Sequence, residues 1–174
     1  MKQVIWKYGL FAGAILAALM FLTIPFVEKI GDMGIVLGYT TMLIGFIMIF
    51  LGIRAYRDGE GGGKVSFGRA FVIGLAITVI GSLCYVGAWE AMSRKYMPDF
   101  AEKYSARIMA KARAEGKPEA ELAAQQKELA EFATSYKNPW YRMPLTLLEP
   151  LPVGLILSLV AAGVLRRGPG ASAG

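Results

Sequence analysis

Two glutamates are the side chains whose positions could support chemistry. Glu149 is the single charged residue in the otherwise uncharged run 143–165, and Glu90 directly follows the uncharged run 70–89. An acidic side chain in or beside an apolar segment costs free energy unless it has a partner. Such a residue therefore often carries a proton or binds a cation. The pattern is compatible with a proton or cation site formed by Glu149 and Glu90. The simpler alternative for Glu90 is contact with water or with Arg94, one helical turn later.

Prolines around Glu149 indicate a broken helix. Pro150 and Pro152 follow it and Pro144 precedes it. Because proline disfavours α geometry in the preceding residue, we expect Glu149 and Leu151 to leave the α region, with a further break at Pro144. Transporters build sites from broken helices that carry ionisable side chains. The alternative places Glu149 at the membrane interface, beside the N-terminus of the regular helix, where its charge is favourable, and its position near the start of the run favours this second interpretation.

The segment 54–69 is the second candidate, because it is polar and rich in glycine. Its Gly63-Lys64 pair resembles the end of a phosphate-binding loop, but Val65 stands where Ser or Thr would bind magnesium, and an apolar helix precedes it where a strand is needed. We therefore expect a flexible turn whose arginines lie at lipid headgroups. Its candidate functional residues are Arg54, Arg57 and Asp58.

Four long runs, uncharged except for Glu149, define the elements that position these residues. At a rise of about 1.5 Å per residue, twenty helical residues span about 30 Å, the thickness of the hydrocarbon core of a bilayer. The runs are apolar on all sides, which is typical of helices surrounded by lipid. The sequence predicts an all-α transmembrane four-helix bundle. The predicted spans are residues 8–27, 33–53, 70–89 and 143–165.

Residues 98–138 differ from the spans in being alanine-rich and charged, and are too polar to cross a bilayer. Pro98 suits the opening turn of one helix, and Gly116 and Pro118 indicate a turn before a second helix. We predict an extramembrane helical hairpin between the third and fourth spans. Its apolar faces would hold Phe100, Tyr104 and Ile108 on the first helix and Leu122, Leu129, Phe132 and Tyr136 on the second.

The distribution of basic residues predicts the orientation. Four spans place both termini on one side, which would carry eight of the basic residues in short segments, whereas the opposite short loop has Lys29 alone and the region Arg94 to Arg142 has ten. The positive-inside rule is read from short loops, so we expect cytoplasmic termini and residues 98–138 outside. Residues 168–174, which are Gly, Pro, Ala and Ser, are expected to be disordered.

Composition limits the chemistry that the chain can perform. It has no histidine and one cysteine, Cys84, which lies within an apolar run. This excludes a disulfide framework and, by ligand count, most zinc and haem sites, so no metal or cofactor is predicted. The net charge of +6 is assigned to loops facing anionic lipid and not to nucleic acid, because no basic stripe with interleaved aromatic residues is present.

Glycines at helical spacing predict close helix contacts. Gly38, Gly45 and Gly52 recur at intervals of seven residues, and Gly9 and Gly13 form a small-residue pair four apart. In lipid such smooth faces allow backbones to approach closely. The lipid bilayer is therefore the first expected partner, and self-association or contact with another membrane protein through the glycine faces is the second.

Several short motifs are shared with one known family. They are Leu-Gly-Ile-Arg-Ala-Tyr-Arg-Asp at 51–58, Gly-Gly-Gly-Lys-Val-Ser-Phe-Gly-Arg-Ala-Phe at 61–71, Cys-Tyr-Val-Gly-Ala-Trp at 84–89, Pro-Asp-Phe at 98–100, Lys-Asn-Pro at 137–139 and Leu-Glu-Pro-Leu-Pro-Val-Gly at 148–154. Through them nearly the whole chain resembles the bacterial membrane family called domain of unknown function 4199. The resemblance implies an inner-membrane protein with about four helices. It transfers no activity and no cofactor.

Three functions remain open at this point. We expect a non-enzymatic accessory or interaction protein whose hairpin faces its partner. The alternative is a small transporter or ion pathway centred on Glu149 in the proline-broken fourth span. A membrane enzyme acting on lipid ranks last, because histidine, a poised nucleophile and a metal cluster are all missing from the sequence pattern.

Overall fold

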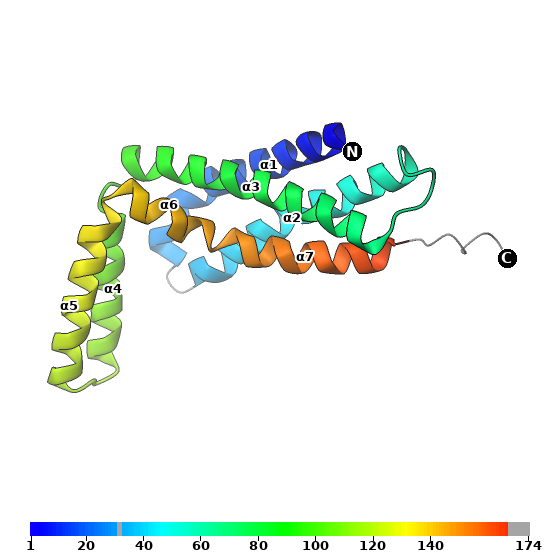
Figure 1. The fold of residues 1–174 in the computed structure, drawn as a ribbon. Helices are drawn as coiled ribbons and strands as arrows, with labels where there is room; N and C mark the ends of the chain where they lie inside the picture. Colours follow the sequence, from blue (N-terminus) through cyan, green and yellow to red (C-terminus); the bar gives the residue numbers. More distant parts are fainter. Residues whose placement is uncertain (31–32, 167–174) are drawn as a thin grey trace. The chain divides into compact units, whose positions relative to one another are not determined.

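The computed structural model of the chain describes residues 1–30 and 33–166 (Figure 1). These residues form seven α-helices, and the tail expected to be disordered at 168–174 lies outside them. The chain divides into two compact units. The first unit comprises Met1–Ala88 and Leu147–Gly174, and the second comprises Trp89–Thr146.

The prediction of an all-helical chain with four long apolar segments is confirmed. The described residues contain four helical segments long and apolar enough to cross a membrane. The third segment is followed by two shorter helices of polar composition. The fourth segment is divided between two helices. The helices are α1 (Lys2–Ile30), α2 (Met33–Asp58), α3 (Phe67–Lys95), α4 (Phe100–Ala114), α5 (Glu119–Tyr136), α6 (Pro139–Leu147) and α7 (Pro150–Leu165).

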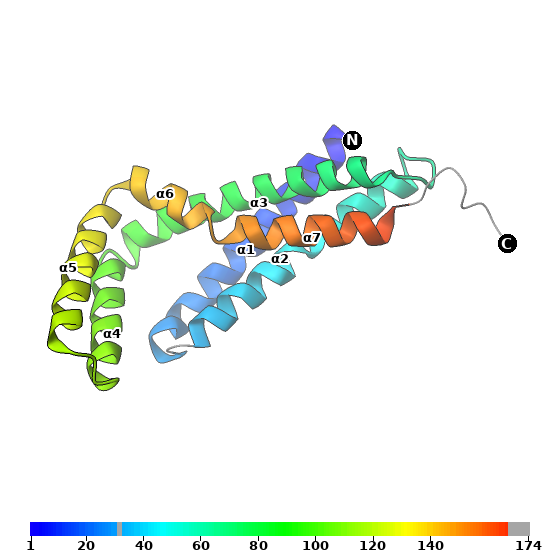
Figure 2. The same cartoon turned by 60° about the horizontal axis from the view of Figure 1, so that its bottom comes forward.

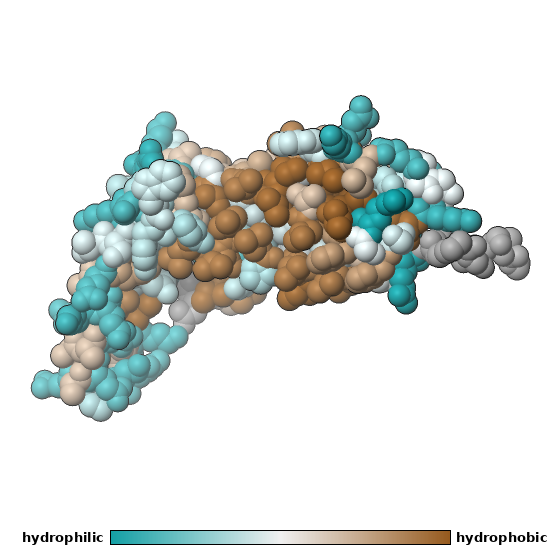
Figure 3. Space-filling model, in the orientation of Figure 1, coloured by the Kyte–Doolittle hydropathy of each residue, from teal (hydrophilic) through white to brown (hydrophobic). Residues whose placement is uncertain are grey.

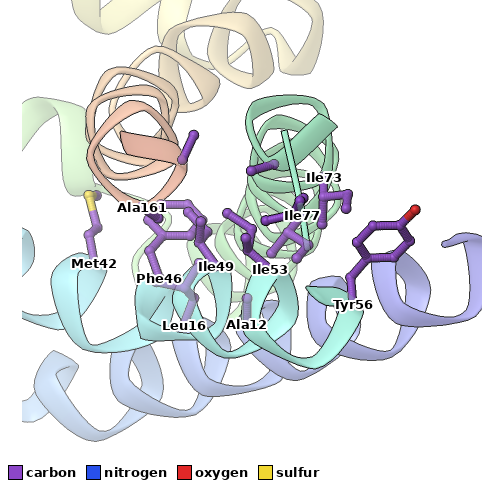
Figure 4. Close-up of a cluster of buried hydrophobic side chains, with 13 residues drawn as sticks. Ala12, Leu16, Met42, Phe46, Ile49, Ile53, Tyr56, Ile73, Ile77 and Ala161 are labelled. Carbon is purple, nitrogen blue, oxygen red and sulfur yellow. The ribbon is translucent and has the colours of Figure 1, made fainter. Parts of the chain in front are cut away.

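The core of the first unit lies around α2, which packs against both α1 and α7. Phe46, Ile49 and Ile53 of α2 are fully buried, together with Leu16 of α1 and Ile77 of α3 (Figure 4). The outer surface of the unit is also apolar, and large hydrophobic side chains cover it broadly (Figure 3). A soluble protein rarely exposes so large an apolar area, whereas helices in lipid do so on every outward face.

Glycines allow the helices of the first unit to approach one another. A Cβ atom added to Gly13 would lie 2.4 Å from the Cβ of Cys84, and one added to Gly45 would lie 2.6 Å from the side chain of Leu16. Most of the predicted glycine faces therefore serve packing inside one chain. A Cβ atom added to Gly9, Gly52, Gly74 or Gly154 would also be crowded, with the nearest side-chain atom at 2.2–2.9 Å. Gly38 differs, because a Cβ there would meet no described atom within 4 Å.

The α2–α3 connection is shorter than the sequence predicted. We expected a loop over 54–69, but α2 continues to Asp58 and α3 begins at Phe67. Arg54 and Asp58 form a pair one helical turn apart, with 3.5 Å between Nε and Oδ2. Because such pairs stabilise a helix and basic side chains favour a helix C-terminus, the helix extends through them. The expectation that Arg54, Arg57 and Asp58 lie in a loop is therefore wrong.

The prolines of the fourth segment break the helix at one place only. The interruption falls at Leu148–Glu149, and α6 runs through Pro144. Glu149 has φ −75° and ψ −56°, so it keeps α geometry and the prediction that it leaves the α region is wrong. The same holds for Leu151, which lies inside α7. Pro150 and Pro152 occupy the first turn of α7, where the missing N–H has no intrahelical partner to lose, so α geometry is tolerated.

In the second unit, α4 and α5 lie side by side (Figures 1 and 2). Gly116, with φ +71°, lies in the connection between them, in a conformation that glycine adopts without strain. The aromatic residues of the two predicted faces pack together. The ring centroids are 6.1 Å apart for Phe100 and Tyr104, 5.8 Å for Phe100 and Tyr136, and 6.0 Å for Tyr104 and Phe132.

Candidate functional site

Glu149 lies at the interruption of the fourth segment, immediately before the first turn of α7. Its side chain is exposed and accepts a hydrogen bond from the hydroxyl of Tyr85 on α3 at 3.1 Å. It forms no side-chain cap on α7. The position matches the interpretation of Glu149 as a residue at the start of the regular helix, where the helix dipole favours its negative charge.

In the buried part of the first unit, polar side chains of α3 and α7 meet between the two helices. Thr78 donates a hydrogen bond to the Gly74 carbonyl at 3.0 Å, Ser158 donates to the Gly154 carbonyl at 2.7 Å, and the two hydroxyl oxygens are 3.2 Å apart. Ser82, one turn from Thr78, is fully buried and its hydroxyl has no hydrogen-bond partner among the described residues. Because hydroxyls in an apolar surround bond within or between helices, the Thr78–Ser158 contact ties α3 to α7.

Glu90 has a partner that its sequence neighbourhood did not indicate. Arg142 of α6 donates from Nε to Oε1 and from Nη2 to Oε2, both at 2.7 Å. Each of the two residues is only 7% exposed. The expected contact with Arg94 is present but longer, at 3.5 Å. The expected contact of Glu90 with Arg94 is therefore confirmed, and the fold adds what the sequence did not indicate, a distant arginine bound to both carboxylate oxygens.

Aromatic residues complete the surroundings of this ion pair. Nη1 of Arg142 donates to the carbonyl of Tyr136 at 3.1 Å, and the guanidinium lies 5.6 Å from the centre of the Tyr136 ring. Trp89 donates from its indole nitrogen to the Tyr136 hydroxyl at 2.8 Å, and its ring meets Phe100 edge to face at 5.0 Å. A buried ion pair is tolerated only when its hydrogen bonds are made, and here both carboxylate oxygens and all three guanidinium nitrogens of the pair are engaged.

This arrangement changes the chemistry open to Glu90. Both of its oxygens are held by Arg142, which neutralises the charge that a proton or cation would need. Among the described residues, moreover, no three His, Cys, Asp or Glu side chains form a group that could hold a metal ion. Glu90 is therefore a structural anchor of the second unit. Of the two candidate glutamates, Glu149 is the one that is exposed and bonded to a tyrosine hydroxyl and not to an arginine.

The glycine-rich connection between α2 and α3 does not form a phosphate cradle. Its amides donate to carbonyls of the last turn of α2 or of the connection itself: Gly61 to Tyr56 at 2.8 Å, Gly63 to Arg57 at 2.8 Å and Lys64 to Gly61 at 3.1 Å. A phosphate site requires backbone N–H groups that point outward to the ligand. Arg57 itself is bound to Asp58, with 2.6 Å between Nε and Oδ1.

A groove between α4 and α5 is a feature that the sequence did not reveal. It has a volume of about 410 Å³ and an open mouth, and its lining is mostly small or apolar, including Ala106, Met109 and Ala130. At one end Lys137 contacts Glu102 at 2.9 Å. The hydrogen bond from Lys137 lowers the pKa of the Glu102 carboxyl below its ordinary value. Helical spacing predicted the apolar faces, but a groove depends on how two helices meet.

Fold and site together define a helical protein with four apolar segments of membrane-crossing length and a polar pair of helices anchored by a buried ion pair. The chain belongs to the family described as protein of unknown function DUF4199, which matches residues 7–167. The family resemblance is thereby confirmed over nearly the whole chain. A comparison with curated proteins gives no match, and neither does a comparison with solved structures.

Proposed function

We propose that this chain is a four-span protein of the bacterial inner (cytoplasmic) membrane that acts as an accessory or interaction protein and not as an enzyme. The exposed apolar side chains of α1, α2, α3 and α7 support insertion in lipid, because so large an apolar surface is rarely left open to water. The polar α4–α5 pair, within the predicted hairpin 98–138, is the part that meets a partner outside the membrane.

The placement of basic residues supports cytoplasmic termini. In the first unit the N-terminus of α1, the α2–α3 connection and the C-terminal end of α7 lie at the same end (Figure 1). This end carries Lys2, Arg54, Arg57, Lys64, Arg69 and Arg166. A concentration of Lys and Arg in short segments at one end is typical of the cytoplasmic side, so residues 98–138 face the periplasm in this proposal.

The observation that carries the proposal is the Glu90–Arg142 pair with its aromatic surroundings. Within the second unit it joins the last turns of α3 to α6, and the packed rings of Trp89, Phe100 and Tyr136 hold α4 and α5 beside it. A pair of polar helices that are already packed together beside an open groove is suited to presenting a preformed surface, since less ordering is then needed on binding.

Deletion of the α4–α5 pair tests this function in the native membrane. Tagged full-length chain and a variant in which a short Gly/Ser linker replaces residues 98–138 are compared by native gel electrophoresis of mild-detergent extracts. The full-length chain is expected to migrate in a complex larger than itself, and the deletion variant is expected to lose that complex while remaining in the membrane fraction. A complex that is unchanged without residues 98–138 would contradict the proposal.

The alternative function is a small proton or ion pathway, and the polar groups between α3 and α7 favour it. Glu149 lies where the fourth segment is interrupted and is bonded to Tyr85 of α3, and Thr78, Ser82 and Ser158 are buried between α3 and α7. Purified chain in vesicles loaded with a pH-sensitive dye would then pass protons under an imposed gradient. Glu149→Gln should abolish the flux and Tyr85→Phe should reduce it. Flux equal to that of empty vesicles would exclude the proton pathway.

A further inference from the structure

We propose that the groove between α4 and α5 is a homotypic interface, which a second copy of this chain fills with its own α4–α5 pair. The inference rests on the proposed function, because it requires that the α4–α5 pair faces a partner. It goes further in naming that partner and the surface that receives it.

The first argument is that two helices alone leave this unit incompletely buried. Tyr136 is the only residue of α5 that is buried, and the apolar residues Leu122, Leu129 and Phe132 remain partly exposed. The groove beside them is lined by small side chains, of which Ala106 and Ala130 are exposed. Alanine lets another helix approach closely, and a second helical layer would bury the partly exposed stripe.

Charge supplies the second argument. Helix α4 has four basic residues and one acidic residue, for a net charge of +3, whereas α5 has four acidic residues and one basic residue, for a net charge of −3. All ten of these side chains are exposed. A partner surface that matches both helices must place negative charge beside α4 and positive charge beside α5. The chain's own α5 and α4 carry those charges.

The charges at the two ends of the groove agree with this pattern. Along α4, Glu102, Ala106, Met109 and Arg113 recur at helical spacing, so Arg113 continues the groove-lining stripe. Along α5, Glu119 stands on the stripe of Gln126, Ala130 and Lys137 in the same way. Glu102 contacts Lys137 at one end, and the connection through Gly116 brings the ends with Arg113 and Glu119 to the other.

Symmetry selects a second copy as the occupant. A two-fold axis parallel to the helices places α4 of each copy beside α5 of the other. The four helices then form a square in which the two α4 helices occupy opposite corners, as do the two α5 helices. Glu102 then lies level with Lys137 of the second copy, and Arg113 lies level with Glu119 of the second copy. Opposite charges are adjacent and like charges are far apart, which favours this pairing over association with an unrelated acidic or basic surface.

Cross-linking of the purified full-length chain in lipid nanodiscs tests the interface. In a Cys84→Ser background, one variant carries Ala130→Cys in the groove and the matched control carries Ala124→Cys, which is also exposed on α5 but outside the groove lining. A short bismaleimide should join two copies through position 130 and leave position 124 monomeric. Equal cross-linking at both positions, or none at position 130, would overturn the proposal.

A charge exchange provides a second measurement that does not depend on cross-linking. Arg113→Glu and Glu119→Arg should each weaken the dimer several-fold, measured by light scattering across a dilution series, and the double variant should restore it. Helix content by circular dichroism serves as the folding control. If both single variants dimerise as the parent does, the proposed surface is wrong.

The outcome also separates this inference from the proposed function. If the purified chain stays monomeric while its native complex still requires residues 98–138, the second copy is not the partner and the interaction role stands. If the native complex persists without residues 98–138, both proposals fail.

Discussion

Arg142 holds both carboxylate oxygens of Glu90, a residue 52 positions earlier in the chain, through two hydrogen bonds of 2.7 Å. The pair is buried and further fixed by Tyr136. This relationship gives Glu90 a structural role, so that of the two candidate glutamates only Glu149 is not bound by an arginine.

Breaking the buried pair from one side should strongly destabilise the second unit. Glu90→Leu leaves the Arg142 charge buried without its acceptor, and a loss of about 3–5 kcal/mol is typical of such changes. The loss should appear as a lower midpoint of thermal unfolding, followed by near-ultraviolet circular dichroism of the aromatic residues in detergent. Glu90→Leu combined with Arg142→Met should recover most of it, because no buried charge remains. A double variant no more stable than the single one would argue against a buried pair.

Two glycines of α2 provide a matched test of helix packing. Gly45→Val would push a side chain into Leu16, whereas Gly38→Val meets no described atom within 4 Å. Overpacking of this kind destabilises by about 1–3 kcal/mol, so the first variant should unfold at lower denaturant and the second should resemble the parent. Detergent-induced unfolding, followed by far-ultraviolet circular dichroism, measures both. Equal effects at the two positions would mean that α1 and α2 do not meet at Gly45.

The Glu102–Lys137 contact should give a small dependence of stability on pH. Lys137 lowers the pKa of Glu102 from its ordinary value of 4.5 in the folded state. The contribution is therefore present above the ordinary pKa and is lost as the pH falls through the lowered folded-state value. Both side chains are largely exposed, so the effect is at most about 1 kcal/mol. Titration of the Glu102 carboxyl by NMR should show a higher pKa in Lys137→Met; an identical value in both proteins would rule the contact out.

Trp140 offers a direct test of membrane contact. Its side chain is 83% exposed, while Trp89 is partly buried and bonded to Tyr136. Tryptophan favours the boundary between hydrocarbon and water, so we expect Trp140 to lie in lipid headgroups. In a Trp6→Phe, Trp89→Phe background, brominated lipids should quench its fluorescence more than aqueous iodide does. Quenching by iodide alone would place this end of the fourth segment in water.

The sequence by itself determined the helical class and the four apolar segments. Both follow from local properties, because a run of uncharged residues long enough to cross a bilayer specifies a helix whatever its neighbours are. The helix interruption beside Glu149 was also predictable from its prolines, although Glu149 keeps α geometry because those prolines fall in the first turn of α7. The extension of α2 through Asp58 was missed, because glycine-rich composition hid a helix end stabilised by charged pairs.

Tertiary structure decided which residues meet. Arg142 could not be assigned to Glu90 from the sequence, since Arg94 stands closer along the chain and nothing local distinguishes the two arginines. The same holds for the Thr78–Ser158 contact and for the groove between α4 and α5. Each joins side chains from different helices, and helix periodicity fixes the face that a residue occupies but not the helix against which that face packs.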